Sequence, residues 1–93
     1  MTVVRVATYP VDSGRVQELI DRANEELVPI YKGQPGFQSL SVVHAGDEIV
    51  SISHWDTSEQ AAAGAAAAMD WAKAQSSIGP ASSNRIGEEL ASA

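Results

Sequence analysis

The sequence has no cysteine, few basic residues and few aromatic side chains. The missing cysteine excludes disulfides, thiolate nucleophiles and thiolate metal sites. Only six Lys and Arg residues stand against twelve Asp and Glu, and the net charge is −6. The basic residues do not cluster, so the chain is poorly suited to bind nucleic acid or an anionic membrane surface. We therefore predict neither a nucleic-acid partner nor a membrane partner.

Long hydrophobic runs are also absent. No apolar segment approaches the roughly 20 residues of a membrane span, and no basic segment followed by an apolar core stands at the N-terminus. A cytoplasmic location is the resulting expectation. The 93 residues predict one domain over residues 1–93. Alanine supplies much of the 44% hydrophobic content, and a small core with few bulky residues favours extra burial through oligomerisation.

The stretch from Pro35 to Thr57 predicts a β-hairpin followed by the start of a helix. Two runs rich in β-branched and aromatic residues, Phe37–His44 and Glu48–Trp55, flank Ala45-Gly46-Asp47. We predict a three-residue loop from Ala45 to Asp47, because a two-residue loop at Gly46-Asp47 would mix apolar and polar side chains on both faces of the hairpin.

The three-residue loop sorts the hairpin into two faces. It pairs Leu40 with Ile52, Val42 with Val50, Phe37 with Trp55 and Val43 with Ile49. One face is then aliphatic and is bounded by polar ends that include His44 and His54. The other carries four serines between an aromatic and an aliphatic pair. Neither face suits solvent, and two helices are the most that this chain can supply. We expect a second copy of the protein to cover the remaining face.

The segments around this hairpin predict a strand–helix–strand–strand–helix–strand order. Thr2–Tyr9 is an interior strand, and a helix with one apolar stripe follows Asp12-Ser13-Gly14. Pro29 should kink or fray this helix, which ends before Gly33. The charged side of the helix is expected to be solvated.

The second predicted helix runs from about Ser58 to Gln75, with Asp56 or Thr57 as its cap. Its alanines either pack closely on the sheet or leave a cavity beneath the helix. Arg85–Ser92 is a short, poor strand or, alternatively, a frayed terminal helix.

Two segments carry a resemblance to a known family: Pro35-Gly36-Phe37 and Trp55-Asp56-Thr57-Ser58-Glu59, with Leu27-Val28-Pro29 in support. They resemble the antibiotic-biosynthesis-monooxygenase-like family of the dimeric α+β barrels. The resemblance spans nearly the whole chain. It implies an α+β, ferredoxin-like βαββαβ monomer whose antiparallel sheet has two helices on one face and which dimerises through its sheet. It also implies a ligand pocket between the sheet and the helices.

The resemblance argues against haem degradation. Members that degrade haem need a tryptophan nine residues after the one matched by Trp55, and a histidine about ten residues further along the helix. Those positions are Gly64 and, near the second, Ala74. A first-strand asparagine of these members falls near Ala7 or Thr8. All three residues are missing here.

The family's quinone-forming monooxygenases imply a reaction without flavin, haem or metal, in which the protein orients a phenolic substrate and stabilises its anion. The predicted catalytic residue is His54. The predicted substrate-binding residues are Trp55, Trp71, Tyr9, Phe37 and Met69. His44 and Arg5 are further candidates, although an end-of-face ion pair with an acidic neighbour is the preferred interpretation of Arg5. His54 and Trp55 alternate along one strand, so regular geometry cannot bring both into one pocket.

Two histidines without a carboxylate at helical spacing predict no metal site. The prediction is therefore a homodimeric monooxygenase that oxidises a small aromatic, quinol-like or polyketide substrate with molecular oxygen and no cofactor. The alternative is a non-catalytic binding or oligomerisation module of the same fold. An isomerase-like member would require His54 as its general base.

Overall fold

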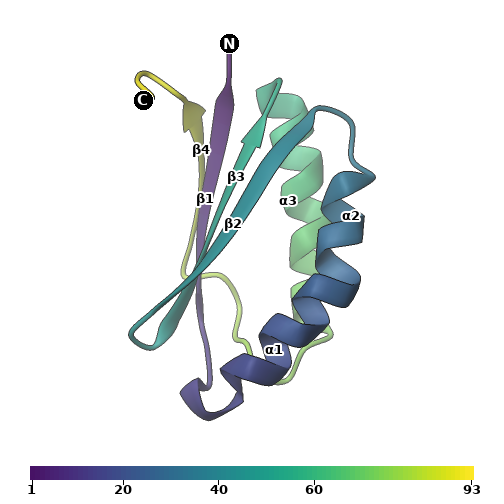
Figure 1. Cartoon of the computed structure of the whole chain (residues 1–93), viewed down its shortest axis with the longest axis vertical. Coiled ribbons are helices and arrows are strands. Elements are labelled where there is room, and N and C mark those ends of the chain that lie inside the picture. Colours follow the sequence, from purple (N-terminus) through teal and green to yellow (C-terminus); the bar gives the residue numbers. More distant parts are fainter.

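The computed structural model describes all 93 residues as a four-stranded antiparallel sheet with helices on one face (Figure 1). The strands are β1 (Val3–Pro10), β2 (Phe37–Ala45), β3 (Glu48–Trp55) and β4 (Ser83–Glu88), in the spatial order β2-β3-β1-β4. The helical segments are η1 (Ser13–Arg15), α1 (Val16–Arg22), η2 (Ala23–Leu27), α2 (Val28–Lys32) and α3 (Ser58–Lys73). This confirms the α+β, ferredoxin-like monomer. The C-terminal segment is a strand, so the alternative of a frayed helix is wrong.

The first helix continues past Pro29 because its backbone changes register just before the proline. Residues Ala23–Leu27 form a π-helical turn, in which the Val28 N–H donates to the Ala23 carbonyl five residues earlier. Proline lacks an N–H and crowds the preceding turn of a regular α-helix. The wider turn accommodates Pro29, and α2 then runs to Lys32. The predicted irregularity is therefore a π turn, and the helix ends before Gly33 as expected.

The charged side of the first helix is solvated, as predicted. Glu18 lies 3.3 Å from Arg15 and 3.4 Å from Arg22 in two exposed ion pairs. The hydrogen bond and the charge of Arg15 lower the pKa of the Glu18 carboxyl. None of the helical segments combines the length and the apolar character that a membrane span requires.

The predicted hairpin register is wrong. Ala45 pairs with Glu48, so the loop has two residues, Gly46 and Asp47, and Gly46 takes the positive φ of 61° that glycine tolerates at the first turn position. The predicted pairing of Phe37 with Trp55 is still present, because a β-bulge between Phe37 and Ser39 inserts one extra residue. Because of this bulge, the hairpin has a two-residue turn and still pairs Phe37 with Trp55 at its other end.

This register moves Leu40 and Val42 to the helix-facing side of the sheet. They pair with Ser53 and Ser51, and Leu40 packs against the hydrophobic core. The predicted division into an aliphatic face and a serine face is therefore incorrect. Each face of β2 and β3 combines serines from one strand with apolar side chains from the other.

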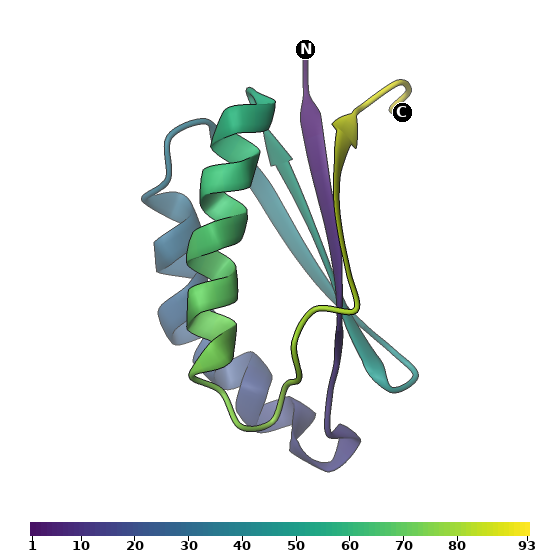
Figure 2. The same ribbon diagram turned by 180° about the vertical axis from the view of Figure 1, so that it is seen from behind.

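The opposite side of the sheet, here called the open face, has no cover within the chain (Figures 1 and 2). Strand alternation and the observed pairing place these side chains on it: Val4, Val6, Thr8, Ser39, Ser41, Val43, Val50, Ile52, His54 and Arg85. Val6 and Val43 are 38% and 46% exposed. Only 17 of the 93 residues are buried, which agrees with the small core expected from the composition.

Candidate functional site

A cavity of about 300 Å³ lies between the C-terminal half of α3, the end of β1 and the loop that leads to β4. Its lining is mostly apolar: Tyr9, Met69, Ala72, Lys73, Ile78, Gly79, Pro80 and Ala81. The cavity contains one cationic side chain, Lys73, and no acidic one. Its size is at the lower end of the roughly 300–1,000 Å³ typical of small-molecule sites.

The loop that walls this cavity is fixed to β1 by backbone hydrogen bonds. The Gly79 N–H donates to the Pro10 carbonyl at 2.9 Å, and the Ser82 N–H donates to the Thr8 carbonyl at 2.7 Å. A Cβ atom at Gly79 would stand 2.8 Å from the Pro10 ring, so glycine permits this close approach. Figure 2 shows the loop leaving the lower end of α3 and crossing to β4. The cavity is therefore preformed.

Arg5 lies behind the cavity, in the layer between the sheet and the helices. Its side chain is completely buried. Its Nη2 donates to the Tyr9 hydroxyl at 2.9 Å, its Nη1 to the Tyr31 hydroxyl at 3.0 Å and its Nε to the Asn84 amide oxygen at 2.8 Å. Arg5 forms no salt bridge. The sequence-based expectation of an ion pair with an acidic neighbour is therefore wrong, and a buried cation is held by neutral oxygens alone.

Two of the predicted substrate-binding residues, Tyr9 and Met69, line the cavity. Met69 is also close to the Arg5 cluster, because its sulfur accepts a 3.7 Å hydrogen bond from the Asn84 amide. Trp71 instead donates from its indole nitrogen to the Glu26 carboxylate at 2.8 Å, which links α3 to the π-helical turn. It does not line the cavity.

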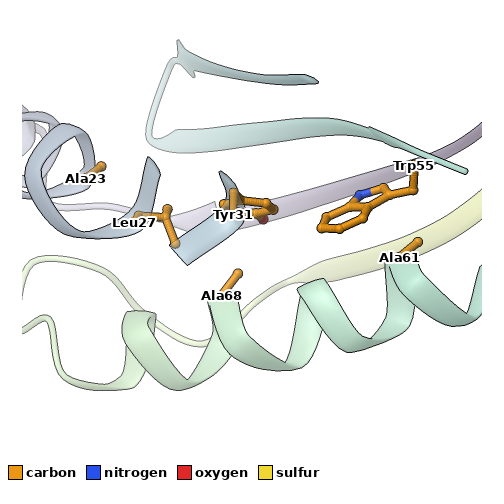
Figure 3. Packing of buried hydrophobic residues seen from close by; sticks show 6 residues of the cluster. All are labelled: Ala23, Leu27, Tyr31, Trp55, Ala61 and Ala68. Carbon is orange, nitrogen blue, oxygen red and sulfur yellow. The ribbon is translucent and has the colours of Figure 1, made fainter. Parts of the chain in front are cut away.

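The other two, Trp55 and Phe37, belong to the hydrophobic core. Trp55 is fully buried and packs against Phe37. Figure 3 shows it beside Tyr31 and the alanines of α3. Its indole nitrogen donates to the Ser53 hydroxyl at 2.8 Å. The outer edge of its ring occupies the space beside Gly64, where an added Cβ atom would stand 2.1 Å from the ring. The alanine-rich helix therefore packs closely at this end and leaves a cavity at the other.

His54, the predicted catalytic residue, lies on the open face. Its Nδ1 is 3.1 Å from the Ser39 hydroxyl, and its Nε2 is 3.2 Å from the Glu89 carboxylate. His44 is exposed beside the hairpin turn. Neither histidine lines the cavity. The structure thus brings together Tyr9 and Met69, places His54 on the other side of the sheet, and adds Arg5, Tyr31 and Asn84 as a cluster that the sequence did not predict.

The family model for antibiotic biosynthesis monooxygenases matches residues 2–75. The chain belongs to the antibiotic biosynthesis monooxygenase family. No curated protein sequence matches it, so the remaining comparisons are with solved structures. Membership of this family supports a monooxygenase-type function for the chain. The segments at Pro35–Phe37 and Trp55, which carried the sequence resemblance, lie within the matched range.

Two solved structures have a fold similar to that of this chain. A monooxygenase from the ActVA-Orf6 gene of Streptomyces coelicolor, in complex with nanaomycin D, is 18% identical with a TM-score of 0.77, covering 98% of this chain and 89% of that one. The haem-degrading protein MhuD of Mycobacterium tuberculosis, with two haems in its active site, is 22% identical with a TM-score of 0.74, covering 98% of both chains. At these identities the likeness shows the shared fold.

The residues of this family member do not fit haem. The Trp55 ring fills the space beside Gly64, and no histidine reaches the cavity. No group of three or more His, Cys, Asp or Glu side chains is arranged to hold a metal ion.

Proposed function

We propose that this protein is a monooxygenase that oxidises a small aromatic, quinol-like or polyketide substrate with molecular oxygen and without a cofactor. The observation that carries this proposal is a preformed, apolar cavity lined by Tyr9, whose hydroxyl accepts a hydrogen bond from the buried cation of Arg5. Met69, Ile78 and Pro80 give the cavity apolar walls suited to an aromatic ring, and Tyr9 is the one phenolic residue that lines it.

The proposed chemistry requires orientation and charge stabilisation from the protein. Removal of a proton from a phenol or anthrone makes an electron-rich anion that can react with oxygen directly. For an anthrone, the ring methylene becomes a carbonyl: one oxygen atom joins the carbon, and the other leaves as water with the two methylene hydrogens. The substrate supplies all the electrons. The positive charges of the buried Arg5 and of Lys73 stabilise this anion, because the low-dielectric interior strengthens the interaction.

The test is oxygen consumption with a panel of hydroquinones and anthrones. We expect protein-dependent turnover that falls at least tenfold in Ala72→Phe, because the phenyl group fills a cavity at the lower size limit for ligands. Ala66→Phe is the matched control, since Ala66 is exposed on the same helix. Absence of protein-dependent turnover across the panel, or equal turnover in the two variants, contradicts the proposal.

The same measurement tests His54, which the sequence proposes as the catalytic residue. In the proposed site, His54→Ala keeps its turnover because the ring lies on the other face of the sheet. Loss of turnover in this variant with normal folding would move the reaction to the open face.

The second candidate is a non-catalytic ligand-binding or oligomerisation module. The filled space at Gly64 favours it, because this position is occupied by the core residue Trp55 rather than left free for a ligand. Ligand binding in the cavity without oxygen consumption would support this candidate over the monooxygenase.

We further propose that a second copy of the chain covers the open face. An exposed aliphatic surface surrounds Val6, Val43 and Ile52, and the chain's own helices all lie on the other side of the sheet. A small core gains stability from additional apolar burial.

The dimer predicts a specific effect of charge on the open face. We expect the wild-type protein to sediment at twice 9.8 kDa at micromolar concentration, and Ile52→Lys to sediment as a monomer because a lysine ammonium cannot be buried unpaired in the interface. Ala66→Lys on the exposed side of α3 is the control and should stay dimeric. A folded wild-type monomer would contradict the dimer.

A further inference from the structure

The cluster behind the cavity has more buried hydrogen-bond donors than acceptors. A guanidinium carries five N–H groups, and only three of those on Arg5 have acceptors. The Tyr9 and Tyr31 hydroxyls both accept from Arg5, and neither donates its own proton to another group. Two N–H groups and two phenolic protons are therefore without acceptors in a region where Arg5 is fully buried and Tyr31 is 1% exposed.

The charge balance at this place is as uneven as the hydrogen bonding. Burying an ionised group is costly unless an opposite charge compensates it. The chain has twelve acidic residues and a net charge of −6, yet none of these carboxylates pairs with Arg5. The cavity adds a second cation, Lys73, and again no acid. The region around Arg5 and the cavity is therefore positively charged, although the protein as a whole is acidic.

We infer that the cavity selects aromatic ligands that carry a carboxylate, with the anion accepting a hydrogen bond from the Tyr9 hydroxyl. This inference rests on the cavity that the proposed function uses, and it adds the charge of the ligand. The Tyr9 oxygen already accepts from Arg5, so its proton is free to point toward the cavity. Arg5 is a positioning residue that acts through Tyr9 and supplies the compensating charge, and Tyr31 and Asn84 hold it in place. Lys73 interacts with the anion from the cavity mouth.

A pair of matched, unreactive ligands tests this selection without any turnover. 2-Naphthoate and 2-naphthamide have nearly the same shape and differ in charge. We expect calorimetry to show the naphthoate binding about 10- to 100-fold more tightly, the range for a hydrogen bond to a charged group. In Arg5→Met and in Tyr9→Phe this preference should fall to within about threefold, because the charge or the donor is gone.

Arg22→Met is the matched control, since it removes an exposed arginine of α1 that lies neither at the cavity nor on the open face and should keep the full preference. Circular dichroism shows whether each variant is folded. If Arg5→Met does not fold, Lys73→Met takes its place: Lys73 is exposed, and its removal should lower the preference for the naphthoate in part. Equal binding of the two ligands to the wild type, no binding of either, or a preference that survives in a folded Tyr9→Phe variant overturns the inference.

The outcome is separable from that of the proposed function. Charge-selective binding with no oxygen consumption would leave the inference standing and remove the monooxygenase. Oxygen consumption with equal affinity for the charged and neutral ligands would support the monooxygenase and overturn the inference about ligand charge.

Discussion

Replacing Gly64 by alanine is expected to lower the free energy of unfolding by about 1–3 kcal/mol, the usual cost of overpacking a core. In an exposed helix position the same change would stabilise the protein by about 1 kcal/mol, because alanine is the best helix former. Here the added methyl group would stand 2.1 Å from the Trp55 ring, which is fully buried and cannot swing away. Chemical denaturation of the two proteins measures the difference.

Two further variants show whether Trp55 is the cause. In a Trp55→Phe background, Gly64→Ala should be neutral or stabilising, because the shorter ring withdraws from the helix. Ala63→Gly is the matched helix control, and at this exposed position it should cost about 1 kcal/mol through propensity alone. A stabilising Gly64→Ala in the wild type would show that the helix does not pack on Trp55 as described.

Tyr31→Phe is expected to lower the free energy of unfolding by about 1.5–3 kcal/mol, the range for a hydrogen bond to a charged group. The change removes only the hydroxyl that accepts from Arg5 at 3.0 Å, and it leaves the ring in contact with Phe37 and Trp55. The cost arises because a buried cation loses one of its three neutral acceptors and gains no other.

A double-mutant cycle tests this cause. In an Arg5→Met background, Tyr31→Phe should have little effect, since no charge remains to be stabilised. In an Arg22→Met background it should keep its full cost, because Arg22 is exposed on α1 and forms no hydrogen bond with Arg5 or Tyr31. An equal cost of Tyr31→Phe with and without Arg5 would mean that the hydroxyl serves another purpose.

The order of strands and helices was predictable from local patterns. The apolar stripe of the first helix, the alanine-rich second helix and the cap at Thr57 are all local signals, and Thr57 does accept from the Gln60 N–H. The hairpin register was not predictable in the same way. A uniform alternation of residues cannot reveal the bulge between Phe37 and Ser39, and the bulge decides which face receives Leu40 and Val42.

The cavity and the Arg5 cluster depend on contacts between distant residues. Arg5 meets Tyr31, which is 26 residues away, and Asn84, which is 79 residues away. No spacing within a single element brings these side chains together, so the sequence could offer Arg5 only as a candidate cation. Tyr9, at a strand end, and Met69, near a helix end, were candidates from the sequence, and both line the cavity.

The most direct test of the account is the fate of labelled oxygen in an anthrone incubated with the chelator-treated protein. Under ¹⁸O₂, mass spectrometry should find one heavy oxygen atom in the quinone product and the other in water, with product formation lost in Ala72→Phe and kept in Ala66→Phe. Product that forms at the same rate without the protein, or with its cavity filled, would show that this cavity is not where aromatic substrates meet oxygen.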